Sequence, residues 1–324
     1  MRDAALSPKV LKAAAGDQMC DRNVQSVTAG HEAAVSHIMN LLSFYNVRCL
    51  MTGLRQHKRT ALMLLVVMSI AAIAAAQRGG FFGGRFRLPP NPPYDGAFRY
   101  CRGIYQPNPV GDGGGWTTDY PQADVNLSFR LSELTKTSVS RDRDGNFNHA
   151  NVSPLDDEFY RCPFVMMAEV GRLFLNSREA ERLRDYLLKG GFLWVDDFWG
   201  EYAWRVFETE IRKVFPANQY PIVDIPTSHQ IFHTLYEVKG VSQIPSINFW
   251  LGTGGQTSER GADSREPHAR AIFDDKAHLM VLITHNTDYG DAFEREGEDR
   301  AYFDRFAGLG YAFGINALVY AMTH

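Results

Sequence analysis

Cysteine is scarce in this sequence, and neither sign of charge is in large excess. The 324 residues contain 4 cysteines, none of them in a C-x-x-C pair, so nothing supports a zinc-ribbon or thioredoxin-like site. The formal net charge of −3 gives no electrostatic reason to expect nucleic acid as a partner. With 45% hydrophobic and 22% charged residues, the composition is that of a globular protein and argues against bulk disorder.

Long apolar runs are also few, and the one near the N-terminus is short for a transmembrane helix. It spans Thr60–Ala76, 17 uncharged residues that follow the basic stretch Arg55–Arg59, whereas a spanning helix needs about 20. A basic stretch, an apolar stretch and small residues before a cleavage site are typical of a secretory signal peptide. We therefore expect a signal peptide over 51–76, cleaved after Ala76, and a periplasmic or secreted protein. An uncleaved membrane anchor is the alternative.

A signal peptide belongs at the start of a chain, yet 50 residues precede this one. We interpret residues 1–50 as a misassigned translation start, with a disordered cytoplasmic extension as the alternative. The membrane is then a partner only through the transient signal segment. Residues 1–76 hold more basic than acidic side chains, so the exported chain is more acidic than the whole and is not expected to bind nucleic acid.

Two cysteines, Cys101 and Cys162, remain in the exported chain. Each lies in or just before a predicted strand, and an oxidising compartment lets disulfides persist. The sequence favours two buried free thiols, and a disulfide is the alternative.

Residues 77–97 are rich in glycine, proline and arginine and predict a flexible linker. From residue 98 onward, strand-like and helix-like segments alternate, which predicts a single α/β domain over 98–324 with a mostly parallel sheet covered on both faces. Strands are expected at 98–105, 137–142, 163–169, 192–197, 220–226 and 247–255, with a hairpin over 270–285. Helices are expected at 124–135, 176–191, 201–216 and 299–324, with a short helix or turn at 229–238. Asp124 and Ser177 are the expected N-caps of the first two helices.

Four segments carry a family resemblance: LRDYLLKGGFLWVDDF (183–198), HQIFHTLYEV (229–238), HLMVLITHNTDYGDAFE (278–294) and AFGINALVYAMT (312–323). In this order they resemble the bacterial family catalogued as domain of unknown function 4159, from about Phe98 to the C-terminus. The resemblance implies the class I glutamine-amidotransferase-like superfamily and its flavodoxin-like three-layer α/β/α sandwich. It implies no reaction, because the family's molecular function is not established.

Catalytic members of that superfamily carry a cysteine on a sharp strand-to-helix turn, paired with a histidine. Here the strand at 192–197 is followed by Phe198 and Trp199, which cannot attack a substrate, and Cys162 precedes its strand. Neither G-x-S-x-G nor G-x-C-x-G occurs in the sequence. We therefore expect an amidotransferase-like domain without its nucleophile.

Ligands of open α/β sheets bind beyond the carboxyl ends of the strands, and polar residues follow three of the predicted strands. The candidate ligand-binding residues are Glu169, Asp197, Trp199, His285, Asn286 and Asp288. Because side chains alternate along a strand, we expect one of the adjacent acids Asp196 and Asp197 to cap a helix or brace a loop, and the other to face the cleft. The candidate catalytic residues are Asp196, Asp197, His229 and Asp288.

Metal binding has weaker support. On a helix His229 and His233 would share one face, which makes them a candidate zinc pair. However, Gln230 stands where the metalloprotease pattern needs Glu, so hydrogen bonding at the sheet edge is the preferred interpretation. The acidic segment 286–299 predicts a solvated loop, with calcium binding as the alternative. The sequence indicates no cofactor.

The sequence therefore predicts an exported, non-catalytic domain that binds a small polar or carbohydrate ligand or an envelope protein partner. A carboxylate- or metal-dependent hydrolase is the alternative, and a purely structural envelope component is the third hypothesis. Five aromatic residues are candidates for stacking on a sugar or for the core: Trp116, Tyr120, Trp199, Tyr202 and Trp204.

Overall fold

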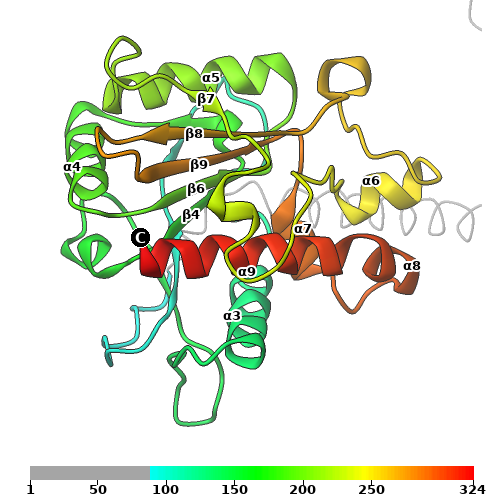
Figure 1. The fold of residues 1–324 in the computed structure, drawn as a ribbon, viewed down its shortest axis with the longest axis horizontal. Helices are drawn as coiled ribbons and strands as arrows, with labels where there is room; N and C mark the ends of the chain where they lie inside the picture. The colour runs from blue at the N-terminus through cyan, green and yellow to red at the C-terminus, as the bar shows by residue number, and fades with distance from the viewer. Residues whose placement is uncertain (1–87) are drawn as a thin grey trace, which may run out of the picture. The chain divides into compact units, whose positions relative to one another are not determined.

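A seven-stranded sheet forms the centre of the computed structural model, which describes residues 88–324 (Figure 1). The predicted signal peptide, the segment before it and most of the linker lie outside the described residues. Five strands run parallel, in the spatial order β3 (His149–Val152), β1 (Tyr100–Gly103), β4 (Val165–Ala168), β6 (Leu193–Asp196) and β9 (Leu279–His285). In chain order these are strands 2-1-3-4-5, the flavodoxin-like arrangement. The predicted fold class is confirmed.

Two further strands extend the sheet beyond β9. β8 (His268–Phe273) pairs antiparallel with β9, and β7 (Val223–Asp224) pairs antiparallel with β8. The predicted hairpin is therefore confirmed, and the sheet is mixed at this side.

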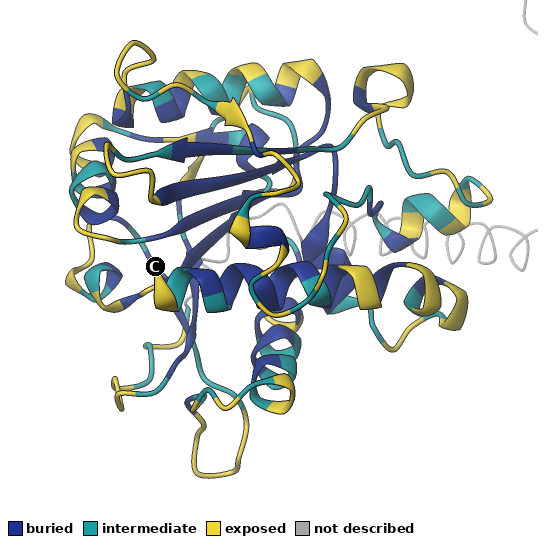
Figure 2. Cartoon of the chain, viewed as in Figure 1, coloured by how far each residue is buried: buried dark blue, intermediate teal, exposed yellow. Residues whose placement is uncertain are grey.

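Helices cover both faces of the sheet, because its strands are apolar on both sides. Along β6, Trp194 belongs to one hydrophobic cluster, whereas Leu193 and Val195 belong to the other. The helices on the Trp194 face are α3 (Gln122–Leu134), α7 (Tyr289–Glu294) and α9 (Gly308–Thr323). The helices on the opposite face are α4 (Ser177–Leu188) and α5 (Gly200–Val214). The result is a three-layer arrangement with the sheet buried in the middle (Figure 2).

The last helical segment is a core element. It consists of α8 (Arg300–Tyr302), a π-helical turn (Phe303–Ala307) and α9. Among the described residues this is the helix long and apolar enough to cross a membrane, but 61% of its most apolar stretch is buried in the domain. Its apolar character therefore follows from packing against the sheet (Figure 2).

Several local predictions were wrong. The expected strand 247–255 is the short helix α6 (Ile247–Gly252), because the Ser246 hydroxyl accepts from the Phe249 N–H and starts a helix instead. The expected strand 137–142 contributes only isolated bridges, one of them between Val139 and Phe98. The remaining short elements are β2 (Gln106–Pro107), β5 (Leu173–Phe174) and the 3₁₀ helices Asp157–Arg161, Val170–Arg172, Gln230–Phe232 and Gly261–Ser264.

The two predicted N-caps were also wrong. Asn176, one residue before Ser177, caps α4, and its capping box with Glu179 satisfies two backbone N–H groups at once. Asp124 lies inside the first turn of α3, where it is fully buried and receives both the Nε and an Nη of Arg102 on β1. Because the Asp124 carboxylate is used in this buried ion pair, it does not cap the helix.

The expectation of two free thiols was wrong as well. Cys101 on β1 and Cys162, just before β4, form a disulfide, with their Cα atoms 6.1 Å apart. The two cysteines meet because β1 and β4 are neighbours in the sheet although Cys101 and Cys162 are 61 residues apart. The sequence alone did not predict that β1 and β4 are adjacent strands.

The described chain begins along the free edge of β3. The Asn91 side chain donates to the carbonyl of Asn151 (2.9 Å) and accepts from its N–H (2.8 Å), as a neighbouring strand would. It also donates to Glu158. Part of the segment predicted as a flexible linker is thus fixed on the sheet.

Candidate functional site

The carboxyl edge of the parallel sheet concentrates unusual backbone conformations. Glu169 follows β4, Asp197 follows β6 and Asn286 follows β9, and all three have positive φ, at 55°, 56° and 61°. Asp119, in the loop that precedes α3, has φ 62°. Non-glycine residues rarely adopt this left-handed region, and such strain gathers where function requires a fixed geometry. This edge is therefore the candidate site.

Asp196 and Asp197 have different roles, as expected from their alternation along the strand. Asp196 is fully buried, and its carboxylate accepts from the N–H groups of Tyr289 (2.7 Å) and Gly290 (3.2 Å) and from the hydroxyl of Thr284. It braces the start of α7 against the sheet. Asp197 follows the strand in a left-handed conformation, and its Oδ1 accepts from Trp199 Nε1 (3.0 Å).

Glu169 lies beneath a glycine-rich loop at the junction between β1 and β4. A side chain on Gly113 would place its Cβ 1.6 Å from Glu169 Oε2, so only glycine lets the backbone approach this closely. The Thr118 hydroxyl lies 3.5 Å from Oε1. Burial, opposed by a hydrogen bond from the backbone of Gly114, raises the pKa of Glu169 to about 7. The group therefore exchanges a proton near neutral pH.

A second group of acids lies beside these, where the loop before α3 meets the first turn of α7. One carboxylate oxygen from each of Asp119, Asp288 and Asp291 lies within 4.8 Å of the others, and all three residues are buried. Asp288 caps α7 by accepting from the Asp291 N–H (2.7 Å). Asp291 accepts from the Ile247 N–H and from the Tyr302 hydroxyl.

These acids raise one another's pKa values. Burial raises the pKa of Asp119, Asp197 and Asp288 well above the ordinary value, and neighbouring carboxylates raise it further. Among the neighbouring carboxylates, Asp197 raises the pKa of Asp288 most, and Glu169 raises the pKa of Asp197 most. Neighbouring acids thus interact along the whole carboxyl edge, which can hold protons, hydroxyl groups or a cation. The acids of this edge are Glu169, Asp197, Asp119, Asp288 and Asp291.

Three other candidates at this edge are occupied by internal contacts. His285 Nε2 donates to the Gly200 carbonyl (3.2 Å), its ring packs against Phe198, and burial lowers its pKa to about 3. Asn286 accepts from the Gly200 N–H (2.8 Å). Trp199 is 5% exposed and gives its N–H to Asp197. These three side chains are therefore held by contacts within the domain.

His229 does not join the other catalytic candidates. Its ring packs 5.6 Å from that of Phe273, which pairs with Leu279, the first residue of β9. His285 is the last residue of β9, and Asp288 comes after it. His229 therefore lies at the amino edge of the sheet. His229 and His233 do not share the face of an α-helix, because only the 3₁₀ turn Gln230–Phe232 lies between them. Both rings form hydrogen bonds, as in the preferred interpretation: His229 accepts from the Ile231 N–H, and His233 binds Glu237 and the Thr227 carbonyl.

The acidic segment 286–299 is not the solvated loop that was predicted. Its first half forms α7, in which Tyr289, Ala292 and Phe293 enter the core and Asp288 and Asp291 are buried with them. The acceptor that makes this possible is Asp196, since it binds the N–H groups at the helix start.

Sequence reasoning missed Asp119 and the role of Asp291. Asp119 follows no strand, and its only signal is its place in the sequence WTTDYP, before a proline that starts α3. Asp291 had a detectable signal, because Asp288 and Asp291 are three apart, the spacing of an N-cap and its partner.

A model of the family described as Domain of unknown function (DUF4159) matches residues 105–322, more than half of the chain. The chain belongs to this family. The matched part of the DUF4159 domain includes every acid of the carboxyl edge. No curated protein matches the chain.

Proposed function

We propose that this DUF4159 domain binds a small polar ligand, with carbohydrate as the favoured class, at the carboxyl edge between β1 and β4. The single observation that carries the proposal is Glu169, a carboxyl group on a strained turn beneath the glycine-rich loop. β1 and β4 are neighbours at the point where the strand order reverses: the chain continues from β1 to β3 on one side of the sheet, and from β4 to β6 and β9 on the other. Ligands of open α/β sheets bind at this switch point.

The chemistry of the edge suits hydroxyl groups. A carboxyl group with a pKa of about 7 is present in both forms at neutral pH, so Glu169 can accept a hydrogen bond from a hydroxyl or donate one. Asp197 Oδ2 accepts no hydrogen bond from the described residues and is available to a second hydroxyl. Trp116, partly buried in the covering loop, offers an aromatic edge nearby.

Binding without covalent catalysis agrees with the state of the cysteines. The sulfurs of Cys101 and Cys162 are bonded to each other, so neither is free to attack a carbonyl group. The turns after β4 and β6, where an amidotransferase-like domain would present a thiol, carry Glu169 and Asp197. We therefore interpret the domain as an amidotransferase-like fold with acids in place of the nucleophile.

Ligand titration tests this proposal. Isothermal titration calorimetry with a panel of neutral sugars, sugar acids and polyols is expected to give binding that Glu169→Gln weakens about tenfold or more. Glu133→Gln is the matched control, because Glu133 is an exposed side chain of α3 that pairs with Arg130. Equal affinities of the two variants for every bound sugar, or no sugar bound by the wild type, would refute the proposal.

A carboxylate-dependent hydrolase is the second candidate, favoured by the electrostatic interaction between Glu169 and Asp197. Asp197 has its pKa raised by burial and then by Glu169, which is the relationship of an acid and a base that share a substrate. Chromogenic glycosides and esters test it: turnover that is lost in both Glu169→Gln and Asp197→Asn, with a pH optimum near 7, favours the hydrolase. Ligand binding without turnover favours the binding domain.

The proposal places the protein in the periplasm or outside the cell, where an envelope protein is a further candidate partner. The disulfide supports this placement, since such bonds persist in oxidising compartments. N-terminal sequencing of the protein from fractionated cells is expected to begin at Gln77. An uncleaved chain in the membrane fraction would favour the anchor.

A further inference from the structure

We infer that Asp119, Asp288 and Asp291 form a binding site for a divalent cation of the hard, oxygen-preferring class, with calcium as the first choice. Oxygens from the three carboxylates lie within 4.8 Å of one another. Calcium takes oxygen ligands at about 2.3–2.6 Å, so one ion can contact all three. The ligand set contains no nitrogen or sulfur, which disfavours zinc and copper.

The three acids are held in place before any ion binds. Asp119 is fixed by its left-handed backbone, and its carbonyl accepts the Ala123 N–H of α3. Asp288 is fixed by the Asp291 N–H. Asp291 is fixed by the Ile247 N–H and by the hydroxyl of Tyr302. A site with pre-arranged ligands loses little conformational entropy on binding.

Asp119 provides an independent indication that something is bound here. Its residue is 7% exposed, and its Oδ2 is buried without a hydrogen-bond partner among the described residues. The oxygen lies against Gly290, where a Cβ would come within 2.1 Å of it. A buried, unpartnered carboxylate oxygen is unfavourable, and a cation bound between Asp119, Asp288 and Asp291 would satisfy it.

The nearby arginines do not neutralise the cluster. Arg102 gives its Nε and an Nη to Asp124 and is only a more distant neighbour of Asp119. Arg295 is shared among Asp291, Glu294 and Glu298. No described lysine or arginine forms an ion pair with Asp119, Asp197 or Asp288. A divalent cation would supply the missing positive charge.

The cation site adjoins the edge proposed for the polar ligand but does not depend on it. An ion here would join the loop that covers Glu169 to the start of α7, two segments about 170 residues apart in the chain. Its principal effect would be to stabilise the folded state, in which these two segments already lie together. Cation binding is therefore measured with no sugar present, so that either proposal can fail alone.

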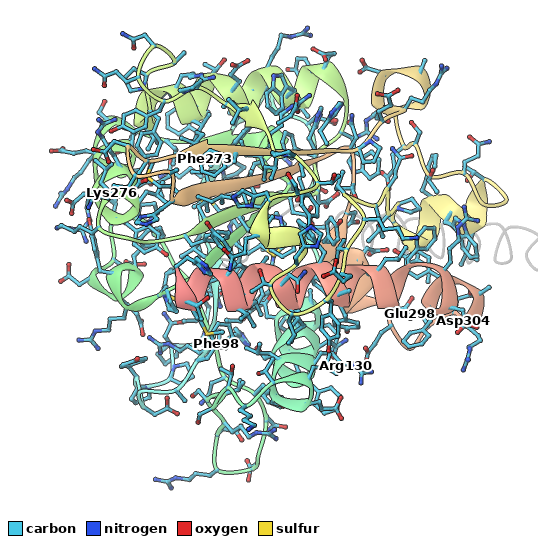
Figure 3. All side chains as sticks on the ribbon, in the orientation of Figure 1. Phe98, Arg130, Phe273, Lys276, Glu298 and Asp304 are labelled. Atoms are coloured by element: carbon cyan, nitrogen blue, oxygen red, sulfur yellow. A yellow bond between two sulfur atoms is a disulfide. The ribbon has the colours of Figure 1, made fainter. Side chains whose placement is uncertain are left out.

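The test compares Asp119→Asn with Asp304→Asn in the full chain after treatment with a chelator. Asparagine is isosteric and tolerates positive φ, so the variant is expected to fold. Asp304 is an exposed acid that pairs with Arg300 (Figure 3). Calcium is expected to bind the wild type and Asp304→Asn with a stoichiometry near one by calorimetry, and to raise Tm by about 5 °C or more at saturation.

Asp119→Asn is expected to abolish this shift and to melt at or above the Tm of the cation-free wild type, because it removes one of the repelling carboxylates. Magnesium and manganese are titrated in parallel. Zinc, which prefers nitrogen and sulfur ligands, is the control cation. Absence of a cation-induced shift in the wild type, or an equal shift in Asp119→Asn, would overturn the inference. Circular dichroism verifies that both variants are folded.

Discussion

The two edges of the parallel sheet use the same residue type in opposite ways. At the amino edge, where Phe273 and Lys276 lie (Figure 3), acids pair locally: Asp185 binds Lys189 at 2.8 Å, and Asp274 accepts from two N–H groups of the β8–β9 turn. At the carboxyl edge, Asp119, Asp197 and Asp288 are buried together without a described cationic partner. The first arrangement pairs each acid with a cation or with N–H groups, whereas in the second, burial and neighbouring carboxylates disfavour the charged form.

This difference indicates what each edge is for. Acids that stabilise a turn need no further explanation, whereas mutually repelling acids must be held together by the surrounding structure, and such arrangements cluster at functional sites. The disulfide reinforces the contrast, because Cys162 ties β1 to the entrance of β4 and leaves the carboxyl edge without a covalent link.

Asp196→Ala is expected to give the largest loss of stability. The substitution leaves the N–H groups of Tyr289 and Gly290 and the Thr284 hydroxyl without their acceptor. At about 1–3 kcal/mol for each buried unsatisfied group, partly relieved by water, the free energy of unfolding should fall by about 3–5 kcal/mol. Urea denaturation at pH 7 measures it. A loss under about 1 kcal/mol would mean that Asp196 does not anchor α7.

Removal of the disulfide is expected to be the next largest effect. Cys101→Ala together with Cys162→Ala should lower the free energy of unfolding by about 2–4 kcal/mol, since the bond closes a loop of 61 residues in the unfolded chain. Calcium and sugar binding should be unchanged, because the bond lies away from the carboxyl edge. Loss of binding in a folded double variant would contradict the separation of the two edges.

The pH dependence of the cation-free protein should have a definite sign. Burial raises the pKa of Asp196 from 3.8 to about 7, so the folded state holds more protons than the unfolded state between these values. The contribution of this group to the free energy of unfolding is then greatest near pH 4 and below, and falls as the pH rises to 7, by an amount on the order of 3 kcal/mol. Thermal melts across this range measure it, and rising stability would contradict the assignment.

Asp185→Asn, at the amino edge, is expected to have the smallest effect. Asp185 is a half-exposed acid that pairs with Lys189 and accepts from the Tyr160 hydroxyl, a donor that the asparagine oxygen can still satisfy. Surface ion pairs of this kind contribute about 0.2–1 kcal/mol. The variant should lower the free energy of unfolding by less than about 1 kcal/mol, and added salt should reduce the difference. An effect as large as that of Asp196→Ala would remove the distinction between the edges.

The general architecture could be predicted because its signals are local. Apolar runs such as VMMA at 165–168 and LWV at 193–195 mark strands buried on both faces, and the turn at Asp274 marks a hairpin. Glu169 and Asp197 could be placed at the carboxyl edge because they directly follow such strands.

What could not be predicted depends on contacts distant in sequence. Asp119 meets Asp291 only after the loop before α3 packs on α7. Cys101 meets Cys162 only because strand order brings β1 beside β4. The burial of Asp288 requires Asp196, on another element, to receive the helix N–H groups. The sequence predicted Glu169, Asp197 and Asp288 along one edge, but which acids meet there is a tertiary property.

Asn91 has a consequence for the behaviour of shortened chains. An edge strand with free N–H and C=O groups can pair with another molecule. In β3, the backbone N–H and C=O groups of Asn151 are hydrogen-bonded to the side-chain amide of Asn91. A protein trimmed to begin at Ala97 would expose this side of β3. Its self-association at high concentration would then arise from the bare strand, while the acidic edge beyond β4 and β6 remained intact.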